Sequence, residues 1–205
     1  MVVSCIDIIR RFVQIMNSNI EKTLKIANNN NDKLRSEIDM VIQIYEDITD
    51  VIRLFQQNYG PLILILQCYC MFVTINQLFY LYGFGLSFKN GSILFKLMLI
   101  VFAMLHSLQL LLIAKAAKYL QHEGNRTKHL WYRFNFLPQN LPVAIEKSVE
   151  EMKLHMVLNP IAIELCGMFT LNYFILYAVI ATGAEYLVML IQFDIGSSKF
   201  AKGLN

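Results

Sequence analysis

An uninterrupted apolar run at residues 61–82 (PLILILQCYCMFVTINQLFYLY) constrains this chain more than any other feature, because it contains no charged residue. A helix needs about 20 apolar residues to cross a hydrocarbon core of about 30 Å. Residues 93–114 and 168–193 form two more runs of sufficient length. The 205-residue chain is 56% hydrophobic, and its 16% of charged residues lies well below the roughly 25% of soluble domains. The sequence therefore predicts an all-α, polytopic membrane protein with three transmembrane helices.

Several classes of protein do not fit these residues. A net charge of +3 is too small for a nucleic-acid binder, which gathers Lys and Arg on one face. His122, His129 and His155 lack the spacing of metal ligands, and no glycine-rich phosphate loop precedes a helix. We expect no enzyme activity, no cofactor and no metal site.

Residues 1–60 predict two helical stretches, joined by the polar NNNND segment at 28–32. The second stretch carries an apolar stripe at helical spacing, made of Ile38, Val41, Ile42, Tyr45, Ile48, Ile52 and Phe55. This stripe either packs within its own subunit or, through Ile38, Tyr45, Ile52 and Phe55, contacts neighbouring subunits. Gly60 and Pro61 are expected to end the pattern before the first span.

The distribution of Lys and Arg predicts the topology. Residues 1–60 and residues 115–160 each carry seven of them, and only four lie elsewhere. Since positive segments stay in the cytoplasm, the N-terminus is expected inside and the C-terminus outside. The predicted order is cytosolic helical region 1–60, span 61–82, extracellular loop 83–92, span 93–114, cytosolic loop and helix 115–167, span 168–193 and extracellular tail 194–205. The second cytosolic segment should hold a helix from about Val143.

Polar side chains in the third span share one helical stripe, with positions 178, 182, 185, 189 and 192 alternating four and three apart. They include Thr182, Glu185, Met189 and Gln192, with Gly183 beside them. Polar groups at membrane depth face protein or water and not lipid. Two interpretations stay open: the stripe serves helix packing, or it lines a water-filled path in which Glu185 and Gln192 recur as rings that suit cations.

The end of this span resembles a known signature. Tyr186, five apolar residues and then Gln192-Phe193 are similar to the Thr-Tyr-x5-Gln-Phe motif of the insect gustatory receptors. The upstream segments GMFTLNYFILYAVIATG, LFKLMLIVFAMLHSLQLLLIA and FQQNYGPLILILQCYCMF resemble the family's last, sixth and fifth helices.

The resemblance implies a seven-helix chemoreceptor of the plasma membrane, with a cytoplasmic N-terminus and an extracellular C-terminus. It implies a ligand-gated, non-selective cation channel, opened by a small-molecule tastant and built as a homo- or hetero-tetramer whose last helices line the pore. The present chain would be a fragment that lacks the first four helices and most of the ligand pocket. The alternative is a non-conducting three-span protein that associates with receptor subunits, or a decayed receptor copy.

Carried onto this chain, the motif places the extracellular gate at Gln192 and Phe193 and its tyrosine at Tyr186. Its threonine falls on Glu185, which departs from the family pattern. The resemblance thus favours a pore-lining role for the stripe and leaves the effect of an acid at this position open.

Overall fold

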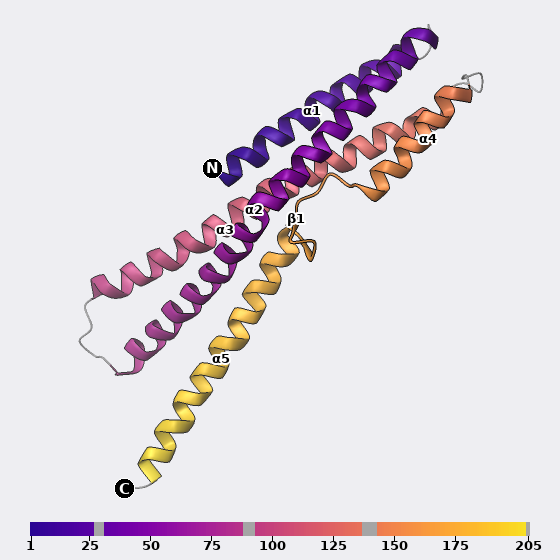
Figure 1. Ribbon diagram of the computed structural model, residues 1–205. Coiled ribbons are helices and arrows are strands. Elements are labelled where there is room, and N and C mark those ends of the chain that lie inside the picture. The colour runs from indigo at the N-terminus through magenta and orange to yellow at the C-terminus, as the bar shows by residue number, and fades with distance from the viewer. Residues whose placement is uncertain (27–30, 88–92, 137–142, 204–205) are drawn as a thin grey trace. The chain divides into compact units, whose positions relative to one another are not determined.

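The chain is almost entirely helical in the residues that the computed structural model describes, namely 1–26, 31–87, 93–136 and 143–203 (Figure 1). The helices are α1 (Val2–Ile26), α2 (Asn31–Ser87), α3 (Ile93–Tyr132), the 3-10 helix η1 (Arg133–Phe136), α4 (Val143–Leu158) and α5 (Tyr173–Gly203). Strands β1 (Glu164–Leu165) and β2 (Phe169–Thr170) form the one sheet seen in these ranges. The predicted all-α class is confirmed.

The chain divides into two compact units. Unit 1 comprises Met1–Pro61 and Lys115–Leu171, and unit 2 comprises Leu62–Ala114 and Asn172–Asn205. The helices α2 and α3 each contribute one part to unit 1 and another part to unit 2. The division follows the alternation of polar and apolar segments in the sequence.

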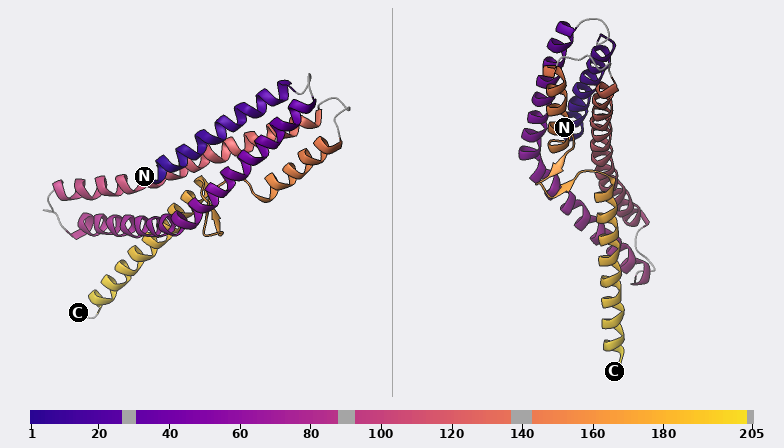
Figure 2. Two further views of the ribbon diagram at one scale, coloured as in Figure 1. Left: turned by 45° about the horizontal axis from the view of Figure 1, so that its top comes forward. Right: turned by 90° about the vertical axis from the view of Figure 1, so that its right-hand side faces the viewer.

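Unit 1 is a bundle in which four helical segments bury apolar stripes against one another. Within this unit, α1 runs beside α3 in each of the views (Figure 2). Its inner face is apolar at three- and four-residue spacing, through Ile6, Ile9, Val13, Met16 and Ile20, all buried. The stripe of α2 behaves in the same way, since Ile38, Tyr45, Ile52 and Phe55 are each less than 7% exposed. These side chains thus pack against other segments of the same chain, and contact with neighbouring subunits through them stays a prediction.

Specific polar contacts hold the helices of unit 1 in register. The buried Thr127 hydroxyl of α3 lies 2.7 Å from the Asn17 side-chain oxygen of α1, and the Asn17 amide donates to the Glu123 backbone carbonyl. The Trp131 indole donates to the Val149 carbonyl of α4 at 3.1 Å. A buried polar group left without a partner costs about 1–3 kcal/mol, so each pair disfavours sliding of one helix along another.

Tyr45 ties α2 to the end of α4. Its hydroxyl donates to the Asn159 carbonyl at 2.7 Å, and its ring meets His155 edge-on. Burial raises the pKa of the Tyr45 hydroxyl, because the phenolate would lose its hydration. The hydroxyl therefore stays protonated and remains a donor.

Three helix boundaries test the sequence pattern. The predicted starts at residue 93 and at about Val143 are confirmed by α3 and α4. The predicted break at Gly60-Pro61 is wrong, because α2 continues through Pro61 to Ser87. Gly60 is buried, and a Cβ added to it would lie 3.6 Å from the Cys166 nitrogen. The helix around Gly60-Pro61 is therefore packed within unit 1.

The helix α5 differs from the predicted span 168–193 at both ends. It begins at Tyr173, where the Asn172 side chain accepts the Phe174 amide at 2.8 Å and so caps the first turn. It continues to Gly203, so most of the predicted tail is helical.

A tight hairpin occupies the residues just before α5. Glu164 pairs with Thr170, and Leu165 pairs with Phe169. The turn places Cys166 and Gly167 at φ of 53° and 67°, and the Met168 amide closes it onto the Leu165 carbonyl. Three residues, 166–168, thus connect the paired Leu165 and Phe169, and the positive φ of the first two lets the chain reverse within this short loop.

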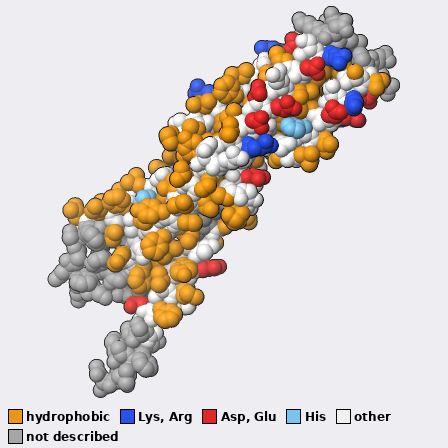
Figure 3. All heavy atoms as spheres, viewed as in Figure 1, with side chains coloured by type: hydrophobic (Ala, Val, Ile, Leu, Met, Phe, Trp, Pro, Cys, Tyr) orange, Lys and Arg blue, Asp and Glu red, His pale blue; other side chains and the backbone are white. Residues whose placement is uncertain are grey.

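Unit 2 has the surface expected of a membrane-embedded bundle. Two helical stretches in the described residues, Leu34–Tyr80 and Leu97–Tyr132, are long and apolar enough to cross a membrane, and only 17% of each one's most apolar window is buried. Figure 3 shows hydrophobic side chains over much of unit 2, whereas charged side chains gather on unit 1. Inside unit 2, Cys70 of α2 lies 3.8 Å from the His106 ring of α3, and Tyr69 meets the same ring edge-on.

Candidate functional site

One face of α5 carries the six residues that the sequence marked as a pore and gate. Thr182, Glu185, Tyr186, Met189, Gln192 and Phe193 are all exposed. The exposed fractions of Met189 and Phe193 are 58% and 77%, which are high for apolar side chains. Helical periodicity brings Thr182, Glu185, Met189 and Gln192 onto one stripe, and all four side chains are exposed.

The opposite face of α5 supplies the packing inside unit 2. A Cβ at Gly183 would lie 3.6 Å from Ile75 of α2, and Ile75 is buried. Leu187, Leu190 and Ile191 are partly covered, unlike the polar stripe. Neither Glu185 nor Gln192 hydrogen-bonds to any other described residue. Packing within the chain's own described helices therefore does not account for these polar groups.

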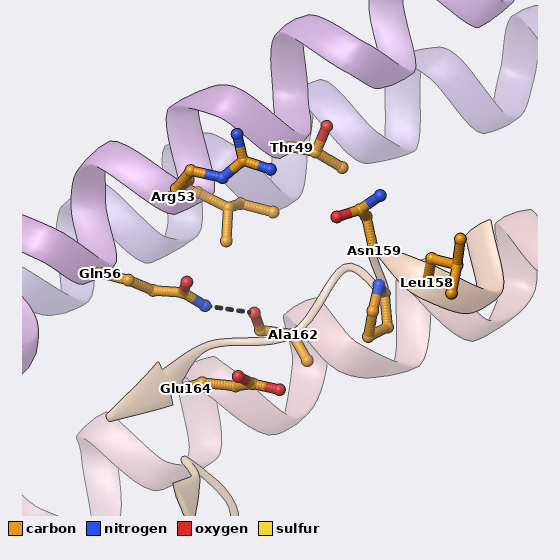
Figure 4. A pocket seen from close by; sticks show the side chains of 9 residues that line it. Thr49, Arg53, Gln56, Leu158, Asn159, Ala162 and Glu164 are labelled. Atoms are coloured by element: carbon orange, nitrogen blue, oxygen red, sulfur yellow. Dashed lines mark hydrogen bonds between the residues drawn. The ribbon is translucent and has the colours of Figure 1, made fainter. Parts of the chain in front are cut away.

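A second feature, which the sequence pattern did not reveal, is a small polar pocket in unit 1. It is lined by Thr49, Ile52, Arg53, Gln56, Leu158, Asn159, Pro160, Ala162 and Glu164. Figure 4 shows α2 side chains facing the segment that follows α4, with Gln56 donating to the Ala162 carbonyl at 2.9 Å. The two walls lie about 100 positions apart in the chain, so periodicity along one helix could not have found them.

The size of this pocket limits what it can hold. Its volume is about 130 Å³. Small-molecule sites usually enclose about 300–1,000 Å³, and one water takes about 30 Å³. The pocket suits a few water molecules that bridge Arg53, Glu164 and the backbone, and it is too small for a ligand of ordinary size.

In the described residues, no three His, Cys, Asp or Glu side chains come close enough together to hold a metal ion. The described residues thus offer two main features. One is the exposed polar stripe on the apolar helix α5, and the other is a well-packed helical unit whose helices continue into long apolar segments. A polytopic helical membrane protein is the class that these features define.

A family model described as 7tm Chemosensory receptor matches residues 1–197. The chain belongs to this family, which confirms the chemoreceptor resemblance read from the motif. The family is one of membrane chemoreceptors that respond to small molecules, and it is not an enzyme family. No curated protein matches the chain significantly.

Proposed function

We propose that this chain is part of a taste receptor subunit that acts as a ligand-gated, non-selective cation channel in the plasma membrane. The supporting observation is the two-faced α5, whose Gly183 face packs in unit 2 while its polar stripe is exposed. In a homo- or hetero-tetramer, four such stripes around one axis would give a path ringed by Glu185 and Gln192. Acidic rings favour cations over anions.

Three spans and their orientation belong to the same proposal. Residues 61–82 and 93–114 lie in the two long apolar helices, and 168–193 overlaps α5, whose described residues are mostly apolar. The cytosolic regions 1–60 and 115–167 then correspond closely to unit 1. Of the predicted extracellular loop 83–92, residues 83–87 belong to α2 and residues 88–92 lie outside the described residues.

Gating in this proposal is a shift between two arrangements of the last helices. A small tastant opens the path only to the extent that it binds the open arrangement better than the closed one. Gln192 is the last residue of the stripe and Phe193 follows it, and both are exposed, so in a tetramer they could meet their symmetry copies at the gate.

Replacing Gln192 by alanine in a complete receptor subunit tests this proposal. We expect altered ligand-evoked current, through a changed open probability or unitary conductance, because an amide that meets its copies is removed. Whole-cell and single-channel recording at matched surface expression would measure the change. Gln43→Ala, an equally exposed glutamine in unit 1, is the control and should leave current unchanged. Unchanged currents in the Gln192 variant would contradict the gate.

The orientation has an independent test in N-glycosylation. Asn125-Arg126-Thr127 is an acceptor sequence in a segment predicted to be cytosolic, so we expect no glycan at Asn125. An acceptor sequence appended behind Asn205 through a flexible linker should be modified. The measurement is the mass shift on glycosidase treatment of each form. A glycan at Asn125 would overturn the topology.

A further inference from the structure

Basic side chains from two helices gather around one tyrosine in unit 1. The Arg10 guanidinium of α1 lies 5.6 Å from the centroid of the Tyr119 ring, and the Lys115 ammonium of α3 lies 5.8 Å from it. The two cations are therefore within about 11 Å of each other, which is comparable to the Debye length of about 10 Å at 0.1 M salt. Lys118 is exposed next to Tyr119, and Arg11 is exposed next to Arg10.

This basic cluster, Arg10, Arg11, Lys115 and Lys118, has little neutralising charge. Arg10 meets Asp7 at 3.4 Å in a partly exposed pair, and its Nε is buried without a hydrogen-bond partner among the described residues. Within the described chain, neither lysine has a carboxylate within 4.0 Å. The nearest acids further along both helices, Glu21 and Glu123, are engaged with Arg126. An anion at the cluster would relieve the repulsion and satisfy Arg10.

The position of the cluster along α3 suggests where that anion comes from. Lys115 directly follows the predicted span 93–114, and α3 is continuous there. At 1.5 Å per residue, Tyr119 lies about 7 Å beyond the end of the span. Headgroups occupy about 5–7 Å on each side of the hydrocarbon core, and tyrosine favours this depth.

We propose that Arg10, Lys115 and Lys118 bind the phosphate of an anionic phospholipid headgroup in the cytoplasmic leaflet, with Arg11 at the edge of the site. A guanidinium offers paired donors to phosphate, and a lysine adds a point charge. Basic residues next to a span on its cytoplasmic side attract anionic lipid. This inference rests on the membrane topology in the proposed function, and not on conduction.

The test is lipid retention by the full-length chain in native mass spectrometry, from micelles holding equal amounts of phosphatidylcholine and phosphatidylinositol 4-phosphate. We expect the unmodified chain to retain the phosphoinositide selectively. The double variant Lys115→Gln/Lys118→Gln should bind it roughly thirtyfold more weakly, because two cations are lost. Lys22→Gln/Lys25→Gln removes the same charge from exposed positions at the far end of α1 and should retain it fully. Should the first double variant fail to fold, Lys118→Gln alone removes a charge without touching the ring.

Two outcomes would overturn the proposal. One is equal retention by the cluster variant and the control. The other is binding of free inositol 1,4-bisphosphate as tightly as the lipid, which would assign the site to a soluble phosphate compound. Selective retention in a receptor that carries no current would contradict the channel alone, and a conducting receptor without lipid selectivity would contradict this site alone.

Discussion

Replacing Gly124 by alanine is expected to destabilise unit 1. A Cβ at this position of α3 would lie 2.7 Å from the Ile161 Cβ and 2.9 Å from the Ile161 carbonyl oxygen, both closer than real contacts allow. Overpacking of a core typically costs about 1–3 kcal/mol. Alanine regains about 1 kcal/mol of helix propensity, which offsets only part of that cost. Gly124→Val adds two methyl groups and should abolish the folded unit.

Other glycines of the same chain supply matched controls for this substitution. Gly196 of α5 has nothing within 4 Å of the added Cβ, so Gly196→Ala should be neutral or slightly stabilising. Gly183→Ala would meet Ile75 at an ordinary contact distance of 3.6 Å and should be tolerated. Thermal unfolding of detergent-solubilised protein, followed by size-exclusion fluorescence, measures all three. Equal melting temperatures for the Gly124→Ala and Gly196→Ala variants would contradict the close contact between Ile161 and Gly124 of α3.

Neutralising Glu185 is expected to weaken cation selectivity in a complete receptor. The carboxylate is exposed on the polar stripe, with no ion pair to the described residues of its own chain. A carboxylate attracts a cation 4 Å away by about 1 kcal/mol even in water, and this attraction raises the local cation concentration about fivefold. Glu185→Gln should therefore lower the cation-to-anion permeability ratio by up to about fivefold, measured as a shift in reversal potential under a salt gradient.

Two further substitutions separate charge from shape at this position. Glu185→Asp keeps the charge and should keep most of the selectivity, while Glu150→Gln removes an equally exposed acid from α4 and should change nothing. Loss of assembly with unchanged selectivity, detected by cross-linking of surface receptors, would assign Glu185 to packing between subunits instead.

The sequence predicted helix boundaries well where a local pattern determines them. The start of α3 follows the onset of an apolar run, and α4 starts at Val143, directly after Pro142. The hairpin before α5 escaped prediction, because Leu165 and Phe169 extend the apolar run and a cysteine at positive φ has no sequence signature. The stripe on α5 was predicted from spacing alone, and its exposure is consistent with that prediction. The pocket of unit 1 could not be predicted, since tertiary packing alone brings Arg53 and Glu164, far apart in the chain, to its walls.

Pro61 lies inside a single helix that is about 85 Å long at 1.5 Å per residue, far more than a bilayer is thick. Its ring carries no N–H, so the Gln57 carbonyl one turn earlier lacks its usual donor in the helix. Unit 1 ends in α2 at this residue, and the charge-free run begins there. A helix bends most easily where one of its backbone hydrogen bonds is missing. The helix α2 therefore bends most easily at the residue where its charged part gives way to its charge-free part.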